Sequence, residues 1–329
     1  MKIPAIFISA LLSTAAASNT VGFDFLRLPV SARAAAASVS LIGYNDHSLS
    51  LRNNPAMLAG INRPAFSLDF SPVIMDIYSG AFSMALILDN GSVLAPSVSY
   101  VNFGTLDRAV DENADEINAR ITPFSLSADL AWAKKFYETL NVGARIKFVH
   151  EQISQQTAYW DAYFSGGFAM DLGIFAQRNF FRYSAGLRNL GFTYDNYESA
   201  NIRFPASSFA GIGVVIEAEA KLAWFLEAEK FFYDYLFFRT GFEFPVHRDI
   251  LVLRTGTIFT PDDIGHLVNT FRGRTVRAWE YSSGTWLLAS VGATVNARIA
   301  GNLLALDIAC QFRKDGLRPS FVFSGTMYF

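Results

Sequence analysis

The sequence predicts an all-β fold: a transmembrane, antiparallel, up-and-down β-barrel of about 14 strands with an N-terminal plug segment. The chain is 15% aromatic, yet beyond its first residues no uncharged apolar run is long enough for a membrane helix. Apolar and polar residues alternate along many runs, and a period of two marks strands whose faces meet different environments. The alternation continues to Phe329, whereas the ends of soluble domains fray unless they are held.

The first residues have the organisation of an export signal. Lys2 precedes a short apolar run to about Leu12, and the alanines at 15–17 fit the small-x-small pattern before a signal-peptidase site. A transmembrane anchor or buried helix is the weaker interpretation, because the run is shorter than the roughly 20 residues of a membrane helix. We therefore expect a cleaved signal peptide at 1–17 and an integral protein of a bacterial outer membrane.

Residues 18–62 break the strand pattern and are predicted to form a plug. They contain an alanine-rich run at 32–37 and the turn-forming sequence Asn-Asn-Pro-Ala at 53–56. Irregular backbone at membrane depth is tolerated only where it is buried in protein or lines a water-filled cavity. We expect this segment inside the barrel or at its periplasmic mouth.

Residues 63–329 are predicted to form the barrel, and the clearest hairpin runs from 124 to 148. A soluble sandwich also alternates, but here full charges occur well inside the strands, as expected for lipid outside and a polar lumen inside. One face of the first strand is apolar, with Phe124, Leu126, Ala128, Leu130 and Trp132. The other face carries Ser125, Ser127 and Asp129.

The same pattern recurs along the chain. An even strand count, with roughly 9–11 residues needed to cross the membrane, suits single-chain bacterial barrels. Short connections mostly alternate with long ones, which predicts periplasmic turns and extracellular loops. The predicted strands lie near 64–71, 77–88, 92–104, 121–136, 139–153, 162–177, 180–192, 206–218, 220–232, 235–246, 249–260, 283–298, 301–314 and 317–329.

Charged residues of both signs share the inward face of the predicted strands. Opposite charges on neighbouring strands pair, so we interpret them mainly as a structural filling of the lumen, with an ion-selective pore as the alternative. The formal net charge of −2 argues against a nucleic-acid binder. The predicted lumen charges are Asp129, Arg145, Lys147, Asp171, Arg188, Glu227, Glu229, Arg239, Glu243, Arg254, Arg298, Asp307 and Arg313.

No catalytic or metal-binding motif is found. The four histidines lie in unrelated parts of the chain, and neither G-x-S-x-G nor H-E-x-x-H occurs. An acidic stretch at 107–116 loosely resembles a calcium loop but lacks its glycine and distal glutamate. We expect a non-enzymatic protein with no cofactor and no metal.

The predicted outer loop at 260–283 is a candidate for binding partners. It combines aromatic residues with arginine, a composition enriched at protein interfaces; a lid that packs on its own barrel is the equal alternative. Lipopolysaccharide phosphates are a further expected partner of its basic residues. The candidate residues are Leu267, Phe271, Arg272, Arg274, Arg277 and Trp279.

The last residues are expected to close the sheet against the first strand. Their aromatic face is interpreted as the signal that the barrel-assembly machinery reads in outer-membrane proteins. That face carries Phe321, Phe323, Met327 and Phe329.

The stretch "FLRLPVSARAAAASVSL", followed by Asn-Asp and Asn-Pro-Ala, resembles the PorV/PorQ proteins of the type IX secretion system, within the FadL-like barrels. The "FLRLPVSAR" form and the "VNFGTLDR" stretch are more similar to PorQ than to PorV. Many members have Gly-Gly after the alanine run, where this chain has Ala37 and Ser38. The resemblance assigns a plug motif to Arg33, Asn45, Asp46, Asn54, Pro55 and Ala56.

This resemblance implies a non-enzymatic component that binds attachment-complex partners at the cell surface. Those partners are a sortase-like protease, a surface β-rich protein, or secreted cargo. The alternative is a FadL-like transporter of hydrophobic small molecules, which needs an apolar tunnel and a lateral exit. Because the predicted lumen is charged, the secretion component is the main hypothesis.

Overall fold

The structure is a computed structural model, and it describes the parts of the chain that form the barrel wall and two stretches of the plug. Several predicted features lie outside the described residues: the export signal at 1–17, Asn45 and Asp46 of the plug motif, and the loop residues Leu267, Phe271, Arg272, Arg274, Arg277 and Trp279. The described residues are 21–38, 53–74, 76–105, 109–110, 116–117, 121–154, 162–196, 202–217, 221–247, 250–261, 263–264, 287–313 and 319–329.

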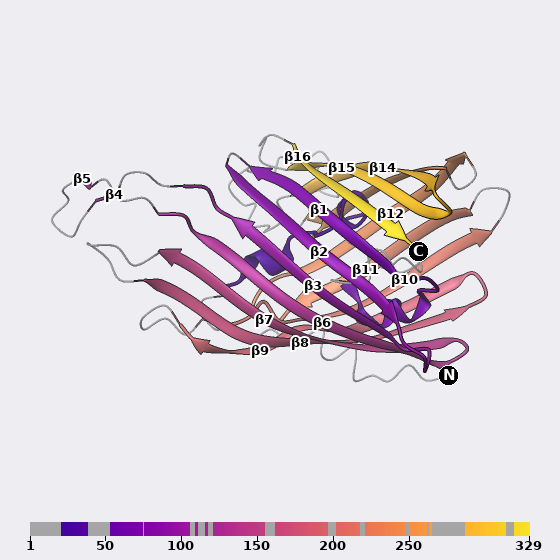
Figure 1. Ribbon diagram of the computed structural model, residues 1–329, viewed down its shortest axis with the longest axis horizontal. Helices are drawn as coiled ribbons and strands as arrows, with labels where there is room; N and C mark the ends of the chain where they lie inside the picture. The colour runs from indigo at the N-terminus through magenta and orange to yellow at the C-terminus, as the bar shows by residue number, and fades with distance from the viewer. Residues whose placement is uncertain are drawn as a thin grey trace.

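Fourteen antiparallel strands form one closed barrel, which confirms the predicted fold class (Figure 1). Each strand pairs with its neighbours along the chain, and a separate pair, β4 (Ala109–Val110) and β5 (Glu116–Ile117), lies between β3 and β6. The barrel strands are β1 (Ala65–Ile74), β2 (Ile77–Ile87), β3 (Val93–Asn102), β6 (Phe124–Tyr137), β7 (Leu140–Ser154), β8 (Tyr163–Arg178), β9 (Phe181–Asp195), β10 (Ser207–Glu217), β11 (Lys221–Phe231), β12 (Leu236–His247), β13 (Leu251–Phe259), β14 (Leu287–Ile299), β15 (Asn302–Arg313) and β16 (Ser320–Tyr328).

The aromatic C-terminus closes the sheet. Strand β16 pairs with β1 in a register that places Tyr328 opposite Ala65, and the Phe329 amide donates a 3.0 Å hydrogen bond to the Pro64 carbonyl. The Phe329 ring lies 5.7 Å from that of Phe66. The last strand therefore has no loose edge, as the sequence predicted.

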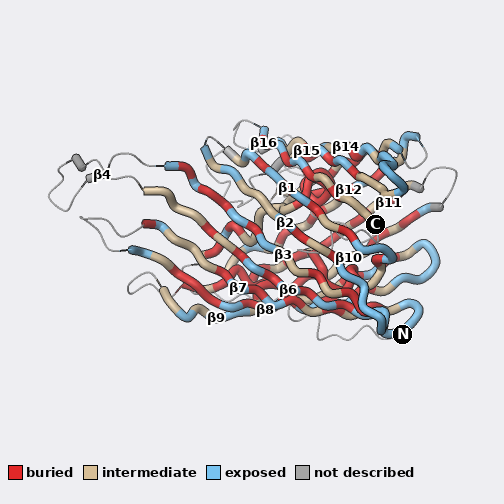
Figure 2. Tube along the Cα trace, viewed as in Figure 1, coloured by how far each residue is buried: buried red, intermediate tan, exposed pale blue. Residues whose placement is uncertain are grey.

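Period-two patterning separates the two faces of the wall (Figure 2). Ile146 is 60% exposed toward the lipid side, whereas its neighbours Arg145 and Lys147 are 1% and 6% exposed inside the barrel. The prediction for Arg298 was wrong. This residue is exposed, because it lies next to the last residue of β14, at the rim of the barrel. The side chain of Arg313 lies outside the described residues. The other predicted lumen charges are buried: Asp129, Arg145, Lys147, Asp171, Arg188, Glu227, Glu229, Arg239, Glu243, Arg254 and Asp307.

The connections distinguish the two ends of the barrel. At the end that holds the start of β1 and the end of β16, the links between strands are short, for example 138–139 and 179–180. The links at the other end include the long segments 103–123 and 260–286, although 75–76 and 232–235 are short. Because short turns face the periplasm in such barrels, we call these the periplasmic and extracellular ends.

The described part of the plug forms three short helices inside the barrel: η1 (Asp24–Arg27), α2 (Ala32–Ala36) and η2 (Pro55–Gly60) (Figure 1). Helix α2 contacts β13 to β16, and η2 contacts β3 and β6 to β8 on the other side. Within the described part of the chain, none of the helices has the length and apolarity for a membrane span. The described plug residues therefore occupy the lumen, as expected from their irregular sequence.

A charge on the outer face tests the assignment of that face to lipid. Replacing Ile146 with arginine should lower the free energy of unfolding by about 2–4 kcal/mol, the cost of a basic side chain near the bilayer midplane. Urea unfolding of the protein in phospholipid vesicles measures the change, with Ile146→Leu as the matched control. An unfolding midpoint that is the same for Ile146→Arg and Ile146→Leu would contradict the assignment.

Candidate functional site

The described plug begins at the extracellular end. Val21 forms a β-bridge with Arg203, which belongs to the link between β9 and β10, and the Gly22 amide donates to the Arg203 carbonyl at 3.1 Å. Arg27 pairs with Asp234, in the link between β11 and β12, at 2.7 Å. We call residues 21–31 the N-terminal arm; it runs from the extracellular mouth down to helix α2.

The alanine-rich run lets helix α2 approach the wall closely. Ser31 caps the helix by accepting a hydrogen bond from its first turn, and the Ala32 amide donates to Ser324 Oγ of β16 at 2.7 Å. A Cβ atom on Gly256 of β13 would lie 2.5 Å from the Ala37 carbonyl carbon. Small residues on both sides are therefore required for this contact.

Arg33 attaches helix α2 to a buried ionic cluster on β12, β13 and β15. Its Nε lies 3.2 Å from Asp307 Oδ1, which is 3.6 Å from Arg254, and Arg254 Nε is 2.5 Å from Glu243. Burial acts to lower the pKa of Arg33, but the Asp307 carboxylate, with smaller contributions from Tyr328 and Glu243, raises it above its ordinary value. The guanidinium therefore stays charged inside the lumen.

The Asn-Pro-Ala sequence fixes helix η2 to strands β8 and β9. Asn54 Oδ1 accepts a 3.0 Å hydrogen bond from the Ala56 amide, while its Nδ2 donates to the Ile174 carbonyl at 2.9 Å and to Ser184 Oγ at 2.8 Å. A Cβ atom on Gly173 would lie 1.8 Å from Asn54 Oδ1. Every polar atom of the Asn54 side chain is thus used, either to begin η2 or to bind the wall. Pro55 supplies the first residue of η2.

A second ionic cluster lies on β7 to β9. Asp171 is 3.2 Å from Arg145 and 2.8 Å from Lys147. Its other oxygen accepts the Asn189 amide at 2.8 Å, and the Asn189 side chain accepts from Lys147 at 2.6 Å. One carboxylate therefore pairs with two buried cations, and both of its oxygens accept hydrogen bonds or ion pairs.

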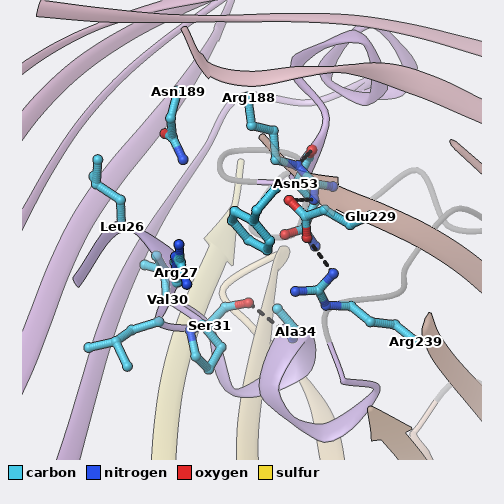
Figure 3. Close-up of a pocket in the computed structure, with 13 residues that line it drawn as sticks. Leu26, Arg27, Val30, Ser31, Ala34, Asn53, Arg188, Asn189, Glu229 and Arg239 are labelled. Atoms are coloured by element: carbon cyan, nitrogen blue, oxygen red, sulfur yellow. Dashed lines mark hydrogen bonds and ion pairs between the residues drawn. The ribbon is translucent and has the colours of Figure 1, made fainter. Parts of the chain in front are cut away.

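A third ionic cluster joins β9, β11 and β12 to the plug, and Figure 3 shows its side chains converging on Glu229. Arg188 lies 2.9 Å from Glu229 and 3.4 Å from Glu227, and Arg239 pairs with Glu229. Arg188 Nε also donates to the Asn53 carbonyl at 2.8 Å. The two arginines and two glutamates balance one another, as in a structural filling.

The cavities around the arm are small. One has a free volume of about 40 Å³, lined by Arg27, Asn53 and Arg239 among others (Figure 3). Another, of about 20 Å³, lies between the arm and strands β2 and β3. An apolar cavity that binds benzene has a volume of about 150 Å³, so neither space holds even a small aromatic molecule while the plug is in place.

The wall itself is interrupted between β2 and β3. The register runs from Tyr78 opposite Asn102 to Ser83 opposite Ser97, and then resumes only at Leu86 opposite Leu94. Pro96 lies in the gap, and proline has no N–H to donate to a ladder. On its other side β3 pairs continuously with β6 through Pro96 and Leu130. We call this gap the β2–β3 seam.

Apolar residues lie behind the seam. Leu58 and Ile61, from helix η2 and the residue that follows it, pack with a buried cluster of small side chains on β2, β3 and β6. That cluster contains Ala85, Val93, Ala95, Ala131 and Ala133. This patch of the lumen is apolar, whereas the inward positions above it on β3 and β6 include Ser99, Ser127 and Asp129.

The structure places the described members of the predicted plug motif on different walls. Arg33 lies on the side of β13 to β16, and Asn54, Pro55 and Ala56 lie on the side of β6 to β8. Among the described residues, no group of three or more potential ligands is arranged to hold a metal ion.

The seam was not predicted from the sequence, although a proline inside the strand-like run "VLAPSVSYVN" was a signal for it.

No family model matches the sequence, and no curated protein matches it either. Among solved structures, the Pseudomonas putida toluene transporter TodX is similar with a TM-score of 0.55 at 12% identity, over 94% of this chain and 98% of that chain. The CymD monoaromatic hydrocarbon channel gives 0.61 at 12% identity, over 91% and 97%. A Pseudomonas aeruginosa FadL homologue gives 0.50 at 12% identity, over 92% and 98%. At this identity the likeness shows the fold, that of FadL-like outer-membrane barrels.

Removing one charge from a buried cluster tests its structural role. Asp171→Ala should lower the free energy of unfolding by about 3–5 kcal/mol, because Arg145 and Lys147 are left without their carboxylate. The matched variant Asp171→Leu with Arg145→Met and Lys147→Met removes all three charges and should recover most of the loss. Urea unfolding in vesicles measures both, and equal stability of the single and triple variants would contradict the pairing.

Proposed function

We propose that this protein is a FadL-like outer-membrane channel that passes uncharged, apolar small molecules from the barrel lumen into the bilayer through the β2–β3 seam. The observation that carries the proposal is the interrupted ladder at Pro96, which lies directly over an apolar patch of the lumen. The similar solved structures include a toluene transporter and a monoaromatic hydrocarbon channel, and this likeness supports the proposal.

The seam should cost less to open than an unbroken stretch of the ladder. Parting two strands elsewhere breaks ladder hydrogen bonds and exposes backbone polar groups to lipid, where each unsatisfied group costs several kcal/mol. At the seam, two successive pairs, Met84 with Pro96 and Ala85 with Ala95, are missing from the ladder. The inward side chains there are alanines packed on Leu58.

The described conformation is a closed state. The arm, α2 and η2 fill the lumen, and the ionic clusters tie α2 and Asn53 to the wall. Passage therefore requires the plug to move while the wall keeps its charge pairs. The charged lumen, which weighed against transport in the sequence, is interrupted at the seam by the apolar patch around Leu58.

Restoring a donor at the seam should slow passage. In cells that carry the protein in a lipopolysaccharide-containing outer membrane, Pro96→Val should reduce uptake of the fluorescent apolar probe N-phenylnaphthylamine roughly fivefold, because one ladder hydrogen bond is worth about 1 kcal/mol. Pro72→Val in β1 is the control, since Pro72 is also an exposed strand proline but pairs with Tyr78 beside a register shift near the end of β1, away from the seam. Equal uptake by wild type, both variants and cells without the protein would refute the channel.

The second candidate function is a component of type IX secretion, and it rests on the resemblance of residues 23–58. All described residues of that stretch belong to the plug, so the resemblance concerns the plug. The candidate partner loop lies outside the described residues. A crosslinked pull-down from detergent-extracted outer membranes tests this function. Recovery of a sortase-like protease, a surface β-rich protein or cargo with a shared C-terminal domain is the expected result; the barrel with only bound apolar molecules would exclude it.

A further inference from the structure

We infer that the lumen contains a binding site for one small monovalent anion of the size of chloride, in the cavity where the arm, Asn53 and the third ionic cluster meet. The site goes beyond the proposed channel, which does not require it. The inference is carried by the charges that line this cavity and by two buried N–H donors that have no hydrogen-bond partner among the described residues.

The cavity joins three separate parts of the protein (Figure 3). The arm contributes residues 26–31, the second described stretch of the plug contributes Asn53, and the wall contributes Arg188 and Arg239 among others. The free volume of about 40 Å³ exceeds the roughly 10–15 Å³ that one water molecule requires. A chloride ion is only slightly larger than water and fits this space. Polyatomic anions such as sulfate are closer in size to benzene, whose cavity is about 150 Å³.

Two buried N–H donors at this cavity have no hydrogen-bond partner among the described residues, namely Asn53 Nδ2 and Arg239 Nε. Asn53 is 5% exposed and Arg239 is 8% exposed. A buried donor without a partner keeps the full cost of its desolvation, so folded proteins normally supply an acceptor. Both residues line the cavity, and an acceptor inside it would therefore lie next to both of them.

The lining of the cavity carries more positive than negative charge. Its charged residues are the three guanidinium groups of Arg27, Arg188 and Arg239 and the single carboxylate of Glu229. The carboxylates of Glu227 and Asp234, which pair with these arginines, are not among the residues that line the cavity. An anion in the cavity therefore meets mainly guanidinium groups, and the attraction between charges is stronger at a buried site than in water.

The lining suits a halide better than it suits water. Water donates hydrogen bonds as well as accepting them, but both oxygens of Glu229 are already used. Its Oε1 accepts from Ser207 at 2.6 Å and pairs with Arg188 at 2.9 Å, and its Oε2 pairs with Arg239. A halide only accepts, and hydrogen bonds from a guanidinium to an anion are roughly twice as strong as neutral ones. The unpartnered donors therefore favour an anion.

The anion can enter from the extracellular end. Arg27 lines the cavity, and the side chains of Arg27 and its partner Asp234 are 24% and 26% exposed. Once bound, the anion contacts the arm, Asn53 and the wall together, although these lie far apart in the sequence. It therefore links the two described stretches of the plug to the wall and stabilises the closed position of the arm.

Crystals of the full-length protein grown in sodium bromide test the site directly, because bromide replaces chloride and is identified by its anomalous X-ray scattering. A bromide peak is expected within hydrogen-bond distance of Asn53 Nδ2 and Arg239 Nε. A cavity that contains only water, or no density, in these crystals would overturn the inference.

Hydrogen exchange of the purified protein in detergent micelles measures the effect in solution. Sodium chloride is compared with sodium gluconate, an anion too large for the cavity, at the same ionic strength of about 0.1 M so that screening is equal. Chloride should slow exchange of the Leu26 and Leu28 amides about tenfold and leave the Phe329 amide, which closes the sheet, unchanged. Equal exchange in both salts would mean binding at crystal concentration only and would also overturn the site.

Two matched variants locate the effect, since each replaces a buried amide with a carboxylate of the same size. Asn53→Asp should raise the half-effective chloride concentration at least about tenfold, because a donor to the anion is lost and a negative charge takes its place. Asn141 on β7 is 8% exposed and does not line the cavity, so Asn141→Asp should leave that concentration within about threefold. Equal shifts in both variants would overturn the assignment to this cavity. None of these measurements involves passage of an apolar molecule, so failure of the site and failure of the channel are distinguished.

Discussion

The structure depends on the closure of one hydrogen-bond ladder. A strand in lipid has no water to bind its backbone, so an open sheet edge is excluded and β16 must meet β1. The pairing of Ala65 with Tyr328 and the Phe329 hydrogen bond to Pro64 complete the ring. Closure also creates a lumen, whose inward polar side chains must find hydrogen-bond or ion-pair partners within the protein.

The lumen meets that demand in two different ways. On β7 to β9, β11 to β13 and β15, buried arginines and carboxylates pair with one another, and each cluster is close to charge balance. Toward the periplasmic ends of β2, β3 and β6, inward alanine and valine pack on Leu58 and Ile61 of the plug, while Ser83, Ser99 and Asp129 face inward above them. The first arrangement makes a rigid scaffold, because a buried charge cannot leave its partner cheaply. The second leaves a small patch without charges.

The seam and the apolar cluster at the extracellular end both involve β3. The apolar cluster includes Val101 of β3, and the seam lies on the same strand at Pro96. The small cavity between the arm and strands β2 and β3 lies between them along β3. Inward Ser99 lies in the same stretch, so the proposed route joins two apolar clusters through a short segment with hydroxyl side chains.

The sequence alone determined the barrel, its strand number and the orientation of each strand face. These follow from period-two alternation, which is local and recurs in every hairpin. It also located eleven buried inward charges, but it placed Arg298 wrongly, it did not predict Asp69 and Arg182, and the side chain of Arg313 lies outside the described residues. The unusual composition of residues 18–62 was enough to predict a plug.

Only the tertiary structure decided what each plug residue touches. The pairing of Arg33 with Asp307 joins residues separated by 274 positions, and Asn54 reaches Ser184 across 130. No local pattern encodes such contacts, because they depend on which strands face the lumen at the same height. The same holds for Phe23: its sequence neighbours suggest an ordinary arm, and its stacking on Phe204 exists only because the closed barrel brings residues 23 and 204 to one mouth.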